Sequence, residues 1–369
     1  MKPAFSSTTS AAAFALLLLL LLLSPVLAGK KFLASREQAY ASQSWKYNPY
    51  PQFMYEFFRQ KGDIDIAVLG SSHIANAINQ QILENALSQK LGRPAVVRMY
   101  VWGGSGFDSL YYIARDLLAH RRVRLLVFHD ENPVGRNRCN QTTFLFRWGE
   151  DSQLVSGLSI ADQGIFYFGS IIGMPRNLLE CLVPNLPGMV FNDKSGWHAL
   201  DSYADMVNQL EVLDWQKRFA FDRMANGKSL EPFSPPVSTS PPDALVYSAA
   251  TRTNFVCSTD VIPEWQAHFG KLFAALAHQY GVKTAMIYVP IMPEARNPAI
   301  PERAFWPKVF GSDMTLVGIP PAKLFSTVSS SDLPKLYGEP IHFNKNGQEY
   351  FTRLMTPALL KIYESSTNN

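Results

Sequence analysis

The residues best suited to chemistry form a short polar segment at 70–73, Gly-Ser-Ser-His, directly after the apolar run 63–69. The run predicts a short buried strand, and the pattern from about 74 to 90 predicts a helix. In a parallel sheet ligands bind at the carboxyl ends of the strands, so a hydroxyl there would be exposed near a helix N-terminus. Ser72 could therefore be a nucleophile. The segment suits equally well a serine that only caps the helix.

A serine nucleophile needs a base that takes its proton, and the base needs an acceptor that orients it. Glu339 and His342 stand three residues apart, just before a helix predicted at about 345–363. We expect them on one turn, where they could supply the acceptor and the base. Taken alone, such a Glu-x-x-His is more often a surface pair.

Two further segments could stabilise an oxyanion. The turn 103–106 follows a predicted strand, and the N–H of Gly106 could approach a reacting centre because glycine adds no side-chain bulk. Asn132 follows the third predicted strand, and its amide could donate to a developing negative charge. A plain tight turn is the alternative for 103–106, which lacks the glycine spacing of dinucleotide-binding loops. A metal site at 129–131 is disfavoured because adjacent strand residues point to opposite faces.

The elements that would position these residues alternate between strands and helices. Such alternation predicts a parallel sheet with right-handed crossovers, hence an α/β sandwich. Between about 133 and 261 the pattern breaks down into a large insertion that ends in a Pro- and Ser-rich stretch. The predicted strands are 63–69, 96–101, 124–128 and 282–289, and the predicted helices are 74–90, 107–119, 263–280 and 345–363.

Composition excludes several classes. The 369 residues are 47% hydrophobic and 17% charged, which is typical of a packed globular protein. The net charge is +4 and the basic residues are scattered, so nucleic acid is not an expected partner. Cys139, Cys181 and Cys257 lack the spacing of a zinc knuckle or a redox pair. We expect neither a metal nor a cofactor.

The N-terminus indicates export. An uninterrupted apolar run at 11–23 follows Lys2 and leads to Val26 and Ala28, small residues at the positions that a signal peptidase favours. Segment 1–28 is predicted to be either a cleaved signal peptide or an uncleaved membrane anchor, since the run approaches the length that spans a bilayer. The basic residues that follow would oppose an anchor with its N-terminus inside. A polar and aromatic lead-in, 29–62, precedes the main domain.

Taken together, the four chemical segments resemble the SGNH (GDSL-type) hydrolase superfamily, whose motifs occur in this order along the chain. The resemblance implies a flavodoxin-like three-layer sandwich over 63–369, with the insertion at about 133–261. Carried over by position, Ser72 is the nucleophile, His342 the base and Glu339 the residue that orients it. The oxyanion hole would then consist of the Ser72 and Gly106 amides and the Asn132 side chain.

The chain departs from the family pattern at three places. Ser71 stands where the family has Asp, and Glu339 stands where it has Asp before the histidine. Around Asn132, Asp130 replaces a glycine and Pro133 replaces an aspartate, which makes this the loosest of the motifs. A Ser-His-Glu triad is chemically sound, because either carboxylate can accept from the imidazole.

With these departures, the export signal and the insertion, the chain resembles the envelope members of the superfamily. Those members act in O-acetylation of alginate or peptidoglycan or in D-alanylation of teichoic acid. The resemblance implies a periplasmic or extracytoplasmic serine esterase or O-acyltransferase, with an acyl donor, a polysaccharide acceptor and a membrane-bound acyltransferase as partner. The alternative is an inactive scaffold of the same fold that binds polysaccharide or that acyltransferase. Four tryptophans could stack on sugar rings, although such residues are more often core: Trp148, Trp197, Trp215 and Trp265.

Overall fold

The structure is a computed structural model, which describes a large part of the chain. The described residues are 6–27, 36–41, 50–102, 106–129, 142, 145–147, 150–167, 232–233, 235, 245–248, 255–258, 262–303, 309–310 and 315–367. The chain divides into two compact units. The first unit comprises Met1–Phe58 and Cys139–Leu210, and the second comprises Arg59–Arg138 and Glu211–Asn369. Most of the lead-in therefore belongs to one unit with part of the predicted insertion.

A six-stranded sheet forms the centre of the second unit, in the order β2-β1-β3-β6-β8-β4. The first five strands of that order are parallel, and β4 pairs antiparallel with β8. The predicted α/β class with a parallel sheet is confirmed, and its parallel strands follow the doubly wound order 2-1-3-4-5 along the chain. The strands are β1 (Ile64–Ser71), β2 (Val97–Trp102), β3 (Val123–His129), β4 (Leu245–Ser248), β6 (Lys283–Ile287) and β8 (Thr315–Gly318).

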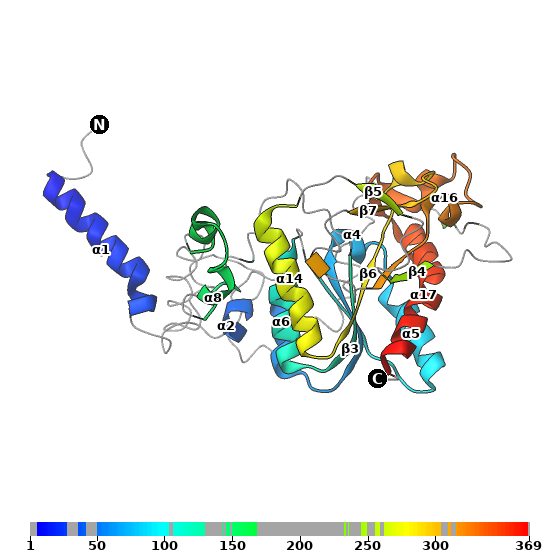
Figure 1. The fold of residues 1–369 in the computed structure, drawn as a ribbon, viewed down its shortest axis with the longest axis horizontal. Helices are drawn as coiled ribbons and strands as arrows, with labels where there is room; N and C mark the ends of the chain where they lie inside the picture. The colour runs from blue at the N-terminus through cyan, green and yellow to red at the C-terminus, as the bar shows by residue number, and fades with distance from the viewer. Residues whose placement is uncertain are drawn as a thin grey trace. The chain divides into compact units, whose positions relative to one another are not determined.

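Two pairs of helices cover the sheet. Helix α6 (Phe107–His120) packs with α14 (Glu264–Gln279), and α5 (Gln80–Leu91) packs with α17 (Lys345–Thr367), as Figure 1 shows. Successive residues of β3 pack against the helices on opposite faces of the sheet, because side chains of a strand alternate between the two faces. Val127 joins the core cluster that includes α5 and α17, whereas the Phe128 ring lies 4.9 Å from that of Phe273 in α14. The arrangement is compatible with a three-layer α/β sandwich.

Several strands of the second unit were not predicted. Strand β4 lies inside the predicted insertion yet adds an antiparallel edge to the sheet, and β8 has only four residues. Strands this short show too little alternation to be recognised in a sequence. The remaining strands form two small sheets, β9 (Tyr337–Glu339) with β10 (His342–Phe343) and β5 (Phe255–Ser258) with β7 (Ile300–Arg303). Short helices are α4 (Ser72–Ala75), η4 (Met292–Glu294), α16 (Pro321–Leu324) and η5 (Leu333–Leu336).

The single helix predicted at 74–90 is wrong, because the structure has two helices there. Helix α4 ends at Ala75 and α5 begins at Gln80. The side chain of Asn79 accepts a hydrogen bond from the N–H of Ile82 at 3.1 Å, which starts a new helix. Apolar periodicity continues through the break, so the sequence pattern does not reveal it.

The first unit is described in part, with helices α1 (Thr8–Leu27), α2 (Arg36–Ala41), α3 (Tyr50–Met54) and α8 (Ser152–Val155), and η2 (Tyr55–Arg59) begins in it. Rings of the lead-in pack on one another, with Tyr40 5.7 Å from both Tyr50 and Phe57. Arg36 donates to Asp151 at 2.7 Å, which ties the lead-in to the predicted insertion. None of the helices within the described ranges is long and apolar enough to cross a membrane.

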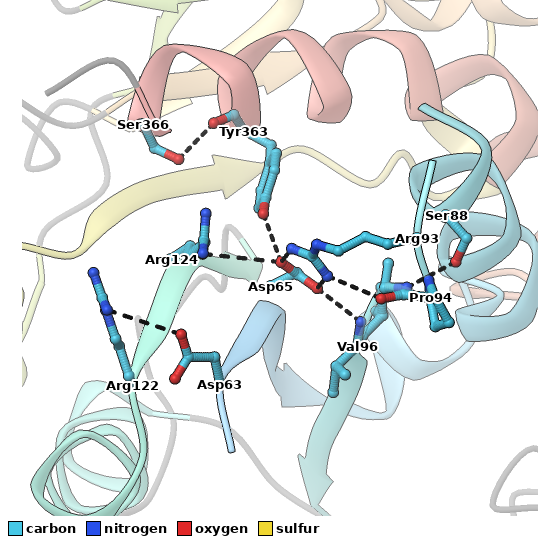
Figure 2. A network of polar contacts seen from close by, with 12 residues as sticks. Asp63, Asp65, Ser88, Arg93, Pro94, Val96, Arg122, Arg124, Tyr363 and Ser366 are labelled. Atoms are coloured by element: carbon cyan, nitrogen blue, oxygen red, sulfur yellow. Dashed lines mark hydrogen bonds and ion pairs between the residues drawn. The ribbon is translucent and has the colours of Figure 1, made fainter. Parts of the chain in front are cut away.

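A buried carboxylate, that of Asp65, lies at the amino end of β1, whereas Ser72 follows the other end of the strand. Figure 2 shows the polar contacts of this carboxylate. Asp65 accepts hydrogen bonds from Arg93 at 2.6 and 3.0 Å, from the Tyr363 hydroxyl at 2.6 Å and from the Val96 N–H at 2.9 Å. Burial opposes ionisation of Asp65, but these hydrogen bonds outweigh it and hold its pKa below the usual 3.8. The network joins β1 to the loop before β2 and to the end of α17.

Candidate active site

Ser72, His342 and Glu339 form a continuous chain of polar contacts. The Ser72 Oγ lies 3.0 Å from the Nε2 of His342, and the Nδ1 of His342 contacts the Oε1 of Glu339. When Nδ1 donates its proton to the carboxylate, the lone pair of Nε2 faces the serine hydroxyl. His342 is buried, whereas the Glu339 side chain is 40% exposed. The structure thus brings together three of the predicted site residues, from segments 270 positions apart.

The strand β1 and the short helix α4 place Ser72 at the carboxyl edge of the sheet. Ser71 is the N-cap residue of α4, and its hydroxyl accepts from the His73 N–H at 3.4 Å. The capping role therefore falls to Ser71, and the Ser72 hydroxyl points to His342. Gly70 allows this sharp turn, since a Cβ there would lie 2.9 Å from Cγ2 of Ile74 and 3.6 Å from Cβ of His129.

A small hairpin presents the base and its carboxylate. Glu339 and His342 are directly opposite each other in the antiparallel pair of β9 and β10, a position in which side chains meet. Glu339 and His342 thus lie close together, as expected, but the turn that connects them is that of a β-hairpin and not of a helix. The Met292 N–H donates to the carbonyl of Pro340 in the hairpin turn at 2.8 Å, so the loop after β6 supports the hairpin.

Tyr337 anchors the start of the same hairpin. Its hydroxyl donates to the carbonyl of Pro290 at 3.0 Å. Burial raises the pKa of Tyr337 far above its ordinary value, and the negative charge of Glu294 adds to the rise, so the hydroxyl keeps its proton and remains a donor. Sequence reasoning did not identify this support, because a tyrosine and a proline 47 positions apart share no recognisable motif.

Asn344 and Gly347 connect the hairpin to α17. The Asn344 side chain donates to the carbonyl of Lys335 at 2.9 Å and accepts from the Gly347 N–H at 3.1 Å, as a helix-capping residue does. Gly347 lies against the chain that precedes the hairpin: a Cβ there would be 2.1 Å from the carbonyl oxygen of Leu336 and 2.6 Å from the Phe343 ring. Only glycine fits this position without movement of the base hairpin.

Replacing Gly347 by alanine is expected to lower the free energy of unfolding by about 2–3 kcal/mol, because the added methyl group collides with backbone. In an open helical position the same change raises it by up to about 1 kcal/mol. Gly164, in the helix 160–167, has nothing within 4 Å of its added Cβ and provides the control. Chemical denaturation measures both variants. Equal stabilities of Gly347→Ala and Gly164→Ala would contradict the close approach.

A second imidazole, that of His73, lies beside the base, and a third, that of His129, lies beside His73. The His73 ring centroid is 4.5 Å from that of His129 and 5.9 Å from that of His342, in edge-to-face arrangements. His129 was weighed above as a metal ligand, and its neighbours Asp130 and Glu131 are outside the described residues. Among the residues that the structure describes, no group of three or more His, Cys, Asp or Glu side chains could hold a metal ion. In the sequence, His129 ends a predicted strand and His73 follows another by a few residues, which is the signal for their proximity.

Gly106 stands at the same sheet edge as Ser72, since Ser71 and Trp102 are paired in neighbouring strands and Gly106 precedes α6. The buried Gln266 of α14 accepts from the Phe107 N–H at 2.5 Å. A Cβ on Gly106 would lie 2.7 Å from the Gln266 amide nitrogen. Sequence reasoning missed Gln266, although a glutamine on the apolar face of a helix is a signal. Asn132 and residues 103–105 lie outside the described residues, so the oxyanion hole remains a prediction.

Fold and site together define an α/β protein with a Ser-His-Glu arrangement at the carboxyl edge of its parallel sheet. No protein-family model matches the chain, and no curated protein is significantly similar to it in sequence.

Proposed function

We propose that this chain is a serine esterase or O-acyltransferase of the SGNH type, with Ser72 as nucleophile, His342 as general base and Glu339 as the residue that orients it. The observation that supports the proposal is the contact of Ser72 Oγ with His342 Nε2 at 3.0 Å, with Glu339 at the other ring nitrogen. A serine nucleophile activated by a histidine base and a carboxylate uses this order of contacts. The order of the motifs along the chain supports the assignment to the SGNH type and, with it, a flavodoxin-like three-layer sandwich.

In the first half of the reaction, the Ser72 proton passes to Nε2 of His342 while Oγ attacks the carbonyl carbon of an acyl ester. The tetrahedral intermediate carries its negative charge on the former carbonyl oxygen, where the amides of Ser72 and Gly106 and the side chain of Asn132 are proposed to donate. The bond to the leaving oxygen then breaks, and the imidazolium returns a proton to that oxygen. An acyl-serine remains.

In the second half, His342 takes a proton from the acceptor hydroxyl while its oxygen attacks the carbonyl carbon of the acyl-serine. The bond from that carbon to Ser72 Oγ then breaks, and the imidazolium returns the proton to Oγ, which restores the free serine and the neutral base. Water as acceptor gives hydrolysis, and a sugar hydroxyl gives transfer. The proposed acyl group is acetyl and the proposed acceptor is an envelope or extracellular polysaccharide. The apolar N-terminal segment supports export to the periplasm or the cell envelope, as a cleaved or retained segment, and work beside a membrane-bound acyltransferase.

The proposal is tested by an active-site-directed fluorophosphonate, followed by mass spectrometry of the labelled peptides. We expect one adduct, on Ser72, because only an activated hydroxyl attacks the probe at an appreciable rate. Ser71→Ala is the matched control: it removes the neighbouring hydroxyl, which accepts from the His73 N–H, and the adduct should still form on Ser72. Ser72→Ala should abolish labelling.

The inactive scaffold predicts a different result, in which wild-type protein stays unlabelled or reacts equally after Ser72→Ala. Either result would overturn the proposed enzyme. Of the four tryptophans considered for sugar stacking, Trp265 is buried at 8% exposure in α14, so it offers no open face for a sugar ring. Trp148, Trp197 and Trp215 lie outside the described residues.

A further inference from the structure

The segment between α4 and α5, residues 76–79, follows Ser72 closely, and side chains of α17 bond several backbone groups in it and beside it. Gln348 is buried in α17, and its amide nitrogen donates to the carbonyls of Ala75 at 2.7 Å and of Ile78 at 3.2 Å. One amide group thus holds both ends of the break between the helices. Buried carbonyls need such donors, because an unpaired one costs as much as a lost hydrogen bond.

Thr352, one turn further along α17, bonds the same segment. Its hydroxyl oxygen accepts from the Asn79 N–H at 2.8 Å and lies 3.0 Å from the carbonyl oxygen of Ala77. Thr352 is fully buried. Gln348 and Thr352 therefore face the serine segment from one side of one helix, at the four-residue spacing that puts side chains on a common face.

Helix α17 also follows the base directly, since it begins at Lys345 and His342 stands three residues before it. One helix therefore connects the two halves of the reacting pair: its start is joined to the hairpin of His342, and its first turns hold the segment after Ser72. The distance from Ser72 Oγ to His342 Nε2 depends on both attachments. A displacement of about 1 Å between reacting groups can lower a rate by about 100-fold.

We propose that Gln348, assisted by Thr352, is a positioning residue that sets the distance between Ser72 and His342. The inference rests on the proposed function, and it adds a residue that no catalytic motif contains. The Gln348 amide nitrogen donates to main-chain carbonyls and not to the hydroxyl of Ser72 or the imidazole of His342. It acts through the backbone of α4, whose Ala75 carbonyl accepts its hydrogen bond and whose Ser72 and Ile74 carbonyls accept from the N–H groups of residues 76–78.

A merely structural role for Gln348 makes a different prediction, and Tyr350 supplies the matched control. Tyr350 lies in the same helix, is buried, and donates a hydrogen bond to the carbonyl of Leu324 at 2.6 Å, away from the serine segment. Both substitutions remove a buried polar group at little change in volume: Gln348→Met removes the amide that donates to two carbonyls, and Tyr350→Phe removes a hydroxyl that donates to one. Both should lower the melting temperature, whereas only the first should displace Ser72.

The experiment compares p-nitrophenyl acetate hydrolysis, fluorophosphonate labelling and backbone hydrogen exchange in the two variants. For Gln348→Met we expect kcat and the labelling rate to fall by about tenfold, with KM within about twofold, because the pair is misaligned while the substrate site remains. Exchange in the peptide that covers 72–79 should become faster. Tyr350→Phe should keep wild-type kcat, labelling and exchange in that peptide.

A second pair of variants keeps the test decisive if Gln348→Met does not fold. Thr352→Val removes the hydroxyl and should slow labelling, whereas Thr352→Ser retains it and should restore the rate. Wild-type rates in Gln348→Met, or equally slow labelling in Thr352→Val and Thr352→Ser, would overturn the positioning role alone. An inert wild-type protein would instead remove the proposed function, and the positioning role with it.

Discussion

Alanine in place of Ser72 or His342 is expected to lower kcat for p-nitrophenyl acetate by on the order of 1000-fold or more, since either change ends proton transfer from the hydroxyl. The double variant should be no slower than either single variant, because the two residues act as one unit and their effects do not add. Steady-state kinetics with purified wild-type protein and the three variants measure this. Retained hydrolysis in either single variant would contradict the triad.

Glutamine in place of Glu339 should have a smaller effect on kcat within the same series. The carboxylate orients the imidazole and stabilises its positive form, but it takes no part in bond formation. Its side chain is 40% exposed, so water can partly replace its contact with Nδ1 of His342. A Glu339→Gln variant as slow as His342→Ala would show that the carboxylate does more than orient the ring.

The alternation of strands and helices could be predicted from the sequence, because a buried parallel strand is a continuous apolar run. It placed β1, β2, β3 and β6 to within a few residues. Strand β8 was missed because its four residues carry no period, and β4 because it belongs to a stretch with no regular pattern. Pairing across a sheet is set by partners far away in the chain, which a local pattern does not contain.

The residues of the candidate site likewise divide into those that the sequence could predict and those that it could not. Ser72 and His342 could be proposed because each has a reactive side chain at the end of a recognisable element, and the topology of a parallel sheet puts such ends together. The interruption between α4 and α5 was not predicted: besides the local cap by Asn79, it is held by hydrogen bonds from Gln348, 270 positions or more away. Gln266 and Gln348 are both buried amides that bond backbone, a role decided by tertiary contacts and not by spacing.

A second substitution with a large expected effect lies at the amino ends of the parallel strands, and it affects stability instead of reaction rate. Asp65 is buried with four hydrogen bonds around its two oxygens, and the Arg124 guanidinium lies 4.0 Å away (Figure 2). Burial, followed by the hydrogen bond to Asp65, raises the pKa of Tyr363 to about 12, so its hydroxyl remains a donor throughout the neutral range. Removal of the carboxylate charge would leave cationic and polar groups without their shared acceptor.

Asp65→Asn is therefore expected to lower the free energy of unfolding by about 2–3 kcal/mol at neutral pH, measured by chemical denaturation. Asp63→Asn is the matched control, two residues earlier in the chain. The Asp63 side chain is 49% exposed and that of its ion-pair partner Arg122 is 77% exposed, with 3.9 Å between the charged groups. Loss of this surface ion pair should change the free energy of unfolding by less than about 1 kcal/mol. Equal effects of the two substitutions would show that the buried network adds nothing beyond a surface ion pair.

The pH dependence of the Asp65→Asn effect follows from the direction of the pKa shift. The folded protein holds the pKa of Asp65 below 3.8, so the unfolded chain binds this proton more readily. The stabilisation by Asp65 is thus complete above pH 3.8 and is lost as the pH falls through the lower, folded pKa. The stability difference between wild type and Asp65→Asn should accordingly stay constant from neutral pH down to about pH 5 and shrink only in stronger acid. If the stability difference between wild type and Asp65→Asn already shrinks between pH 7 and pH 5, the pKa of Asp65 in the folded protein is not lowered. The contacts around Asp65 would then not stabilise its charged form.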